Sequence, residues 1–107
     1  MNDLGINKAL ALAIGYSEDR IRDIHGFCQV QNNNSRLDGP MQYGGWQRFD
    51  YRDSAVIWPV AERYDCFPRA SAPDWWTVWD GKKYYDANTD AKAVALAVIG
   101  RQEDGKL

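Results

Sequence analysis

The sequence predicts an α+β fold, a single small domain in which three helices pack against a mainly antiparallel sheet of about four strands, in the order α-β-β-α-β-β-α. Three stretches carry apolar residues at helical spacing, and runs rich in β-branched and aromatic residues lie between them. The 107 residues provide enough chain for one hydrophobic core but too little for a second. We therefore expect one domain over residues 1–107, with a frayed tail at 102–107.

The first helix is expected over residues 3–14. Four apolar residues repeat there at the spacing of one helix face: Ile6, Leu10, Ala13 and Ile14. Asp3 is placed to cap the start of this helix, and Gly15 is placed to adopt the left-handed conformation that commonly follows a helix end. The charged stretch 17–23 suits either a further helical turn or a loop.

Residues 24–30 are expected to form the first strand. Alternation along a strand places Phe27 on one face and three other residues on the opposite face: Ile24, Cys28 and Val30. The polar stretch 31–45 is rich in turn-forming residues, so we expect a loop, of a length that is often functional. A second strand is expected over residues 46–49.

The second helix is expected over residues 54–64, with Asp53 as its N-cap. Pro59 lies beyond the first turn of this helix, where it removes a backbone donor, so we expect a kink there. The neighbouring Trp58 is large and apolar, and we expect it to be at least half buried.

The stretch 75–85 is the most distinctive part of the chain, because five of its eleven residues are Trp or Tyr. Asp80 and Gly81 suit a two-residue type I′ turn between two strands, which would pair Trp79 with Lys82. One face of this hairpin would carry Trp76, Val78, Lys83 and Tyr85. The other would carry Trp75, Thr77, Trp79, Lys82 and Tyr84. Both faces are aromatic, so both are expected to need cover.

The segments on either side of this hairpin are expected to be a loop and a helix. Residues 66–74 are expected to be a loop, because Pro68 and Pro73 disfavour regular structure. The third helix is expected to be capped by Asn88 and to end at Gly100. Its apolar stripe consists of small and β-branched residues: Ala91, Val94, Ala95, Val98 and Ile99.

Charge and composition exclude several classes of protein. Thirteen Lys and Arg against fifteen Asp and Glu give a net charge of -2, which argues against a broad electrostatic nucleic-acid binder but leaves a local basic patch open. No apolar run approaches the roughly 18 residues of a membrane span, and no signal-peptide pattern opens the chain. We therefore expect a cytoplasmic protein without a membrane partner, with Cys28 and Cys66 reduced and buried.

The sequence contains no catalytic motif such as a nucleophile elbow, a phosphate loop or a zinc-binding helix. His25 is the only histidine, and it suits either a hydrogen-bonded strand or turn position or a functional role beside Asp23 and Cys28. Four aspartates could supply a carboxylate pair for acid–base chemistry: Asp50, Asp53, Asp80 and Asp86. We expect no catalytic residue, no metal and no cofactor.

The aromatic hairpin is the strongest candidate for a binding site. Its candidate residues are Trp75, Trp76, Trp79, Lys82, Tyr84 and Tyr85. Aromatic rings beside lysines are used to stack single-stranded bases next to phosphates, and they are equally suited to a protein-binding face. The structural alternative is that most of these rings pack beneath helices.

Three segments resemble small phage and prophage proteins. They are INKA through AIGY in residues 6–16, the pieces FD, DSA and WPV in residues 49–60, and NTDAKAV in residues 88–94. They resemble the NinX-like proteins, a phage family of uncharacterised function (DUF2591), and related phage α-β-α sandwich domains. Where those relatives often have proline at the first helical position, this chain has Ser54 and Thr89. The resemblance implies a phage-encoded protein in the cytoplasm of a bacterial host, and it implies no active site.

The sequence therefore predicts a non-enzymatic accessory protein that binds a host or phage protein. The outer face of the hairpin and the 31–45 loop are the expected contact surface. The alternative is single-stranded nucleic-acid binding through the same aromatic residues. An enzyme acting on a small substrate would need a concave pocket with convergent polar groups. The chain could be a monomer or a homodimer, because a sheet edge or an uncovered aromatic face can pair with a second copy.

Overall fold

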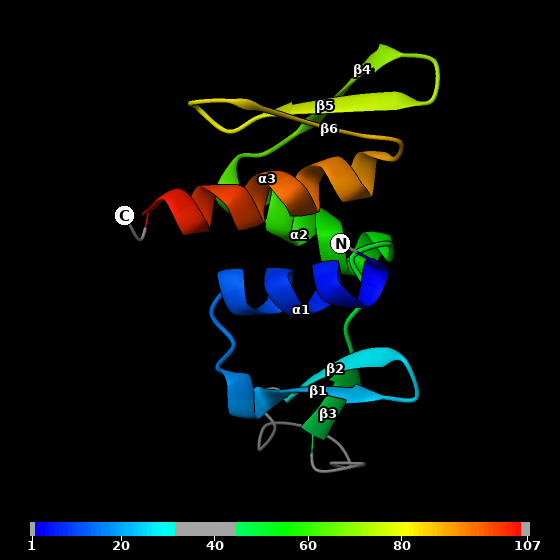
Figure 1. The fold of residues 1–107 in the computed structure, drawn as a ribbon, viewed down its shortest axis with the longest axis vertical. Coiled ribbons are helices and arrows are strands. Elements are labelled where there is room, and N and C mark those ends of the chain that lie inside the picture. Colours follow the sequence, from blue (N-terminus) through cyan, green and yellow to red (C-terminus); the bar gives the residue numbers. More distant parts are fainter. Residues whose placement is uncertain (1, 32–44, 106–107) are drawn as a thin grey trace. The chain divides into compact units, whose positions relative to one another are not determined.

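The computed structural model describes residues 2–31 and 45–105 of the chain. This part contains three α-helices and two three-stranded antiparallel sheets, which confirms the predicted α+β class (Figure 1). The strands form two sheets of three instead of one sheet of about four, so the order is α-β-β-β-α-β-β-β-α. The chain divides into two compact units, residues 1–50 and residues 51–107.

The first unit consists of one helix, one short 3-10 helix and three strands: α1 (Asp3–Ala13), η1 (Glu18–Arg20), β1 (Ile21–Ile24), β2 (Phe27–Gln31) and β3 (Trp46–Arg48). Its sheet, which we call the N-terminal sheet, has the order β1-β2-β3 with antiparallel pairs. The helix α1 packs against β2, on which Cys28 and Val30 are buried. Most of the expected 31–45 loop, residues 32–44, lies outside the described residues.

Both ends of α1 are fixed by local hydrogen bonds. The cap is Asn2, and not Asp3 as predicted, because the Asn2 side-chain oxygen accepts a hydrogen bond from a backbone N–H three residues later at 2.8 Å. Gly15 has a φ of 117°, which confirms its predicted left-handed position. The N–H of Tyr16 donates to the carbonyl of Ala11 at 3.1 Å, as in a Schellman motif.

The strand predicted over residues 24–30 is divided by a tight turn. His25 and Gly26 have φ values of 53° and 82°, and they join β1 to β2 in a hairpin that pairs Ile24 with Phe27. Two positive φ values are required by a type I′ turn, and histidine tolerates the left-handed region better than most residues. The turn moves Ile24 to the exposed face that carries Phe27, away from the buried face where it was expected.

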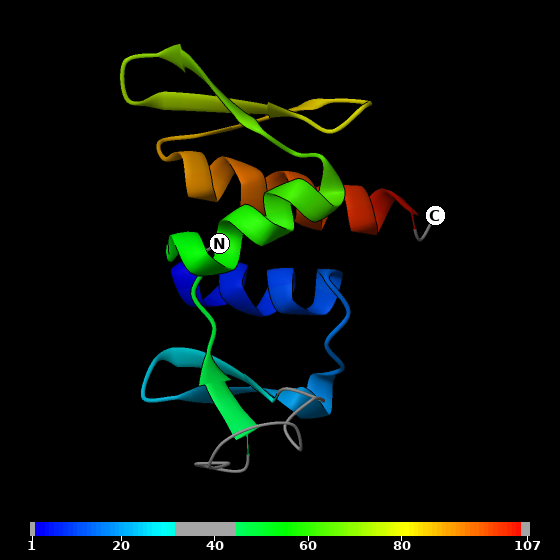
Figure 2. The ribbon, with the colours of Figure 1, turned by 180° about the vertical axis from the view of Figure 1, so that it is seen from behind.

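The second unit consists of two helices and three strands: α2 (Ser54–Tyr64), β4 (Pro68–Ala72), β5 (Trp75–Trp79), β6 (Tyr84–Ala87) and α3 (Asp90–Gly105). Its sheet, which we call the C-terminal sheet, has the order β4-β5-β6 with antiparallel pairs. The helix α3 packs against all three strands, and α2 packs against α3 (Figure 2).

The helix α2 has the predicted bounds, Ser54–Tyr64. The Asp53 side chain accepts a hydrogen bond from a backbone N–H two residues later at 3.0 Å, which confirms it as the cap. Pro59 lies inside the helix, and Trp58 is 37% exposed, so more than half of it is covered as expected. The helix ends where Asp65 adopts a left-handed conformation with φ of 54°.

Residues 66–74, predicted to be a loop, contain the strand β4. Pro68 is the first residue of this edge strand, a position that tolerates proline, and Pro73 lies in the turn that leads to β5. The pairing with β5 shifts between Ala70 and Ala72, which marks a β-bulge. The two prolines therefore fit the ends of a strand.

The β5–β6 hairpin has a longer loop than predicted. Trp79 pairs with Tyr84 and not with Lys82, so four residues form the connection. The Asp80 carboxylate folds over this loop and accepts hydrogen bonds from the backbone N–H groups of Lys82 and Lys83, at 2.7 and 2.9 Å. A shift of two residues leaves the strand side chains on their predicted faces, because the side-chain period of a strand is two.

The helix α3 starts one residue later and ends later than predicted. The Thr89 hydroxyl accepts a hydrogen bond from a first-turn N–H at 3.2 Å, so Thr89 is the cap and Asn88 is not. The helix continues past Gly100 to Gly105. Its buried residues are more numerous than the predicted stripe: Ala91, Ala93, Val94, Ala95, Ala97, Val98 and Ile99. No helix that the structure describes is long and apolar enough to cross a membrane.

Gly100 lies directly beneath a tyrosine ring of the C-terminal sheet. A Cβ atom at this position would lie 2.6 Å from Cε1 and Cζ of Tyr85, which is much closer than real contacts allow. The glycine that was expected to end the helix therefore makes room for the Tyr85 ring against α3.

Replacing His25 tests the type I′ turn. We expect His25→Asn to raise the free energy of unfolding by about 0.5 kcal/mol, because Asn-Gly is the preferred pair for this turn. His25→Val should lower it by about 1 kcal/mol or more, because a β-branched residue is strained at positive φ. Urea unfolding measures both values, and equal stabilities for the two variants would contradict the assigned turn.

Replacing Gly100 tests the packing of Tyr85 on α3. Gly100→Ala should lower the free energy of unfolding by about 1–3 kcal/mol, although alanine favours a helix by about 1 kcal/mol, because the ring cannot retreat without moving the sheet. In a Tyr85→Ala background the same substitution should become stabilising. A thermal or urea double-mutant cycle measures this change of sign, and additive effects would refute the contact.

Candidate functional site

The C-terminal sheet has one face toward α3 and one open face. Val78 and Ala87 are buried on the α3 side, and Trp76 and Tyr85 are partly buried on that side. The strand residues on the open side are Arg69, Trp75, Thr77, Trp79, Tyr84 and Asp86. We call this open side, together with Phe67 and Asp65 just before β4, the aromatic face.

Three of the six residues predicted to bind lie on the aromatic face. Trp75, Trp79 and Tyr84 are 44%, 49% and 67% exposed, which is unusual for such large side chains. The rings of Trp79 and Tyr84 are cross-strand neighbours with centroids 4.6 Å apart and planes tilted by 48°. These three rings are therefore not covered by α3.

The other three predicted binding residues lie elsewhere. Trp76 and Tyr85 lie on the side of the sheet that faces α3, where packing explains them. Lys82 lies in the β5–β6 loop, beyond the strand ends. The structure therefore divides the predicted set between a packed side and an open side, as strand alternation requires.

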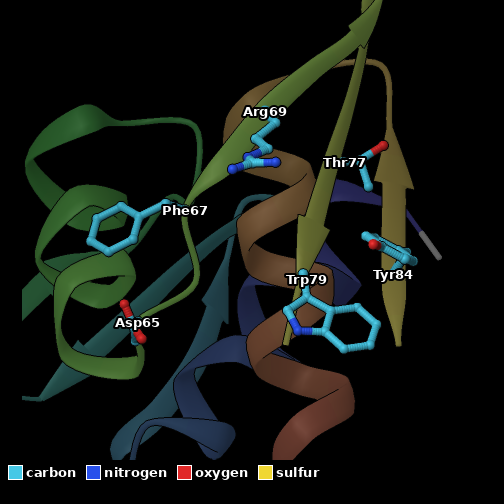
Figure 3. A pocket seen from close by; sticks show the side chains of 6 residues that line it. All are labelled: Asp65, Phe67, Arg69, Thr77, Trp79 and Tyr84. Carbon is cyan, nitrogen blue, oxygen red and sulfur yellow. The ribbon is translucent and has the colours of Figure 1, made fainter. Parts of the chain in front are cut away.

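A hollow of about 310 Å³ lies on the aromatic face (Figure 3). Six residues line it: Asp65, Phe67, Arg69, Thr77, Trp79 and Tyr84. Trp79 and Tyr84 lie on the sheet side of the hollow, and Phe67 and Asp65 lie on the side of the segment that follows α2. The guanidinium of Arg69 lies between these two groups. The arrangement offers aromatic walls with a few polar groups, which is typical of binding sites.

The end of α2 explains how Phe67 reaches the hollow. The left-handed Asp65 reverses the chain, and the N–H of Cys66 donates to the carbonyl of Ala61 at 3.0 Å. The Cys66 side chain is fully buried and anchors this segment. Phe67 follows it and is 52% exposed. The predicted binding set did not include Asp65, Phe67 or Arg69, and the last two lie in residues 66–74, which were assigned to a loop.

The polar groups of the aromatic face are linked across the strands. The Thr77 hydroxyl donates to the Asp86 carboxylate at 2.7 Å and lies 3.1 Å from the hydroxyl of Ser71. Arg69 is the cross-strand partner of Thr77 on the other side. A row of Arg69, Thr77 and Asp86 therefore crosses the sheet. The charges at its two ends have opposite signs.

The aspartates and the histidine have structural explanations. Asp53 caps α2, and Asp80 closes the β5–β6 loop. Burial acts to raise the pKa of Asp80, but the N–H groups of Lys83 and Lys82 outweigh it and lower that pKa. Asp50 lies 3.7 Å from Arg48. His25 is in the β1–β2 turn, and no three metal-ligating side chains gather among the residues described.

Both cysteines are free and buried, as predicted. Burial raises the pKa of the Cys28 thiol to about 11 from an ordinary value of 9.0, and burial likewise raises the pKa of Cys66. A raised pKa keeps each thiol protonated near neutral pH, which makes it a poor nucleophile. The two thiols are therefore core residues and not candidates for covalent catalysis.

The raised pKa of Cys28 predicts a pH dependence of stability. An unfolded thiol loses its proton at about pH 9 and the folded thiol at about pH 11, so stability should fall as the pH rises through this range. Cys28→Ala lacks this contribution, so the stability gap between the wild type and the variant should narrow from about pH 8 to about pH 10.5. Urea unfolding at both pH values measures the gap, and a constant gap would disprove the assignment.

The chain was compared with protein families, curated proteins and solved structures. No family model matches it, and neither a curated protein nor a solved structure gives a match.

Proposed function

We propose that this protein is a non-enzymatic binding module that recognises another protein through the aromatic face of its C-terminal sheet. The observation that carries the proposal is the exposure of Phe67, Trp79 and Tyr84, each between 49% and 67%, around a hollow, with Trp75, 44% exposed, on the same face. Exposed aromatic rings that surround a pocket are the usual anchors of protein interfaces, because they bury a large apolar area at low entropic cost.

The expected partner presents an apolar side chain within a short segment. The hollow of about 310 Å³ has aromatic walls, and it is at the lower limit of size for ligand sites. The carboxylate of Asp65 and the guanidinium of Arg69 supply polar groups beside the rings. Such a site suits one apolar anchor flanked by hydrogen-bonding groups of the partner.

Charge argues against a polyanion at the aromatic face. Its described residues include Asp65 and Asp86 against the single positive charge of Arg69. Single-stranded nucleic acid needs positive charge along its backbone as well as rings for stacking. The predicted alternative of nucleic-acid binding by the hairpin is therefore less well supported there than protein binding.

The resemblance to NinX-like proteins suggests where to look for the partner. It would place the interaction in a bacterial cell that carries a phage, with a host or phage protein as the partner. This origin stays a prediction.

Two phenylalanines of nearly equal exposure provide a matched test. Phe67 is 52% exposed on the aromatic face, and Phe27 is 48% exposed on the N-terminal sheet. Immobilised wild type, Phe67→Ser and Phe27→Ser would be exposed to nuclease-treated bacterial extract, with and without phage infection. Wild type and Phe27→Ser should retain the same protein, and Phe67→Ser should lose it at least tenfold.

Three results would contradict the proposal. Retention of no specific protein by the folded wild type is one, and equal loss in both serine variants is the second. The third is retention from untreated extract that is absent from nuclease-treated extract, because it would assign the contact to nucleic acid. Circular dichroism of the variants establishes that each is folded.

A further inference from the structure

The open face of the N-terminal sheet has a different chemistry from the aromatic face. Strand residues on this side carry cationic, aromatic, amide and, in Ile24, aliphatic side chains, and we call it the arginine face: Arg22, Ile24, Phe27, Gln29, Gln31, Trp46 and Arg48. The register pairs Arg22 with Gln29 and Gln29 with Arg48, so one row across the three strands has a guanidinium at each end.

Each arginine of this row lies over an aromatic ring. The Cζ atom of Arg22 is 4.1 Å from the ring centroid of Trp46, and that of Arg48 is 4.3 Å from the ring centroid of Phe27. Both distances lie well within the range of cation–π contacts. The rings therefore hold the two guanidinium groups on the sheet surface.

Polar contacts position the two arginines further. Nε of Arg22 donates to the side-chain oxygen of Gln29 at 2.9 Å, which uses one of the five guanidinium donors. Arg48 lies 3.7 Å from the Asp50 carboxylate, a long ion pair in which the Arg48 side chain stays 58% exposed. Arg48 therefore keeps contact with solvent, and Arg22 is partly buried and held in place.

The charge of the arginine face is positive although that of the whole chain is -2. Among the strand residues that the structure describes on this side of the sheet, none is acidic, and Asp50, two residues after β3, offsets part of the charge of Arg48. The corresponding row of the aromatic face reads Arg69, Thr77 and Asp86, with opposite charges at its ends. The two open sheet faces thus share aromatic rings but differ in charge.

We propose that the arginine face binds single-stranded nucleic acid. Guanidinium groups at both ends of the row attract backbone phosphates, and the guanidinium planes that cover the rings of Trp46 and Phe27 suit stacking by unpaired bases. The amide of Gln29 lies between the two arginines and offers hydrogen bonds to base edges. This second surface is independent of the protein-binding proposal, because it lies on another sheet and uses other residues.

Fluorescence anisotropy with labelled single-stranded oligonucleotides tests the proposal on the full chain. The probes are a mixed-sequence RNA, the DNA of the same sequence, and the corresponding DNA duplex, at about 50 mM salt. Both single strands should bind more tightly than the duplex. The logarithm of affinity should fall with the logarithm of salt concentration with a slope of about -1.5, as two phosphate contacts predict. Tighter RNA binding would indicate a contact with the 2′-hydroxyl.

Two double variants distinguish an effect of the arginine face on binding from an effect of the protein's net charge. Arg22→Gln with Arg48→Gln should weaken binding about tenfold or more, whereas Arg63→Gln with Lys92→Gln makes the same charge change on α2 and α3 and should alter it less than about threefold. The single variant Arg48→Gln is a second test in case the double variant does not fold. It should fold, because the Arg48 side chain is exposed. Arg48→Lys keeps the charge but loses the planar group, so a partial loss is expected if bases stack there.

Any one of four results would overturn the proposal. These are no single-strand binding at low salt, duplex binding as tight as single-strand binding, equal losses in the two double variants, and an unchanged affinity in folded Arg48→Gln. Phe67→Ser should leave oligonucleotide affinity unchanged, so this proposal and the protein-binding proposal can fail separately.

Discussion

The packing of small α3 side chains against one side of the C-terminal sheet is the contact on which the second unit depends. Alanine and valine occupy most of the buried helix surface, and Gly100 admits the ring of Tyr85. Small residues let a helix approach a sheet closely, and Trp76 and Tyr85 are partly buried on that side. Because strand side chains alternate, Trp75, Trp79 and Tyr84 lie on the open face.

In the first unit, too, a helix covers one side of a sheet, but the residues on the other side differ in type. Cys28 and Val30 are buried on the side of β2 that α1 covers, so the alternate residues of the strand point away from the helix. There the sequence supplies arginines and glutamines together with aromatic rings. Charge, and not ring content, therefore distinguishes the two open faces. This difference in charge is why we propose a protein partner for the aromatic face and a nucleic-acid partner for the arginine face.

Much of the fold follows from local sequence signals, and the failures have local physical causes. Apolar spacing and the Asp53 cap were enough to predict both bounds of α2. Asn2 and Thr89 cap α1 and α3, whereas the sequence predicted their neighbours Asp3 and Asn88. Each prediction is wrong by one residue, because the neighbouring positions carry equally suitable side chains. The β1–β2 turn was missed because histidine is rarely the first central residue of a type I′ turn, although the following glycine marks it.

The candidate sites were predicted less completely than the fold. The exposure of Trp75, Trp79 and Tyr84 depends on which side α3 covers, and hairpin alternation alone leaves that choice open. The segment after α2 was assigned to a loop because of its two prolines, and the strand it forms is exposed at every position after the first. The arginine pairs were invisible in sequence, since Arg22 and Trp46 lie on different strands and meet only through the register of the sheet.

The proline and the bulge in β4 have a consequence for self-association. An edge strand presents unpaired backbone groups to which another chain can add, and exposed apolar side chains beside the edge favour such growth. Pro68 removes one donor from the edge strand, and the irregular pairing between Ala70 and Ala72 distorts its line. These features make the β4 edge a poorer template for the addition of another chain, beside a face whose large rings are exposed to solvent.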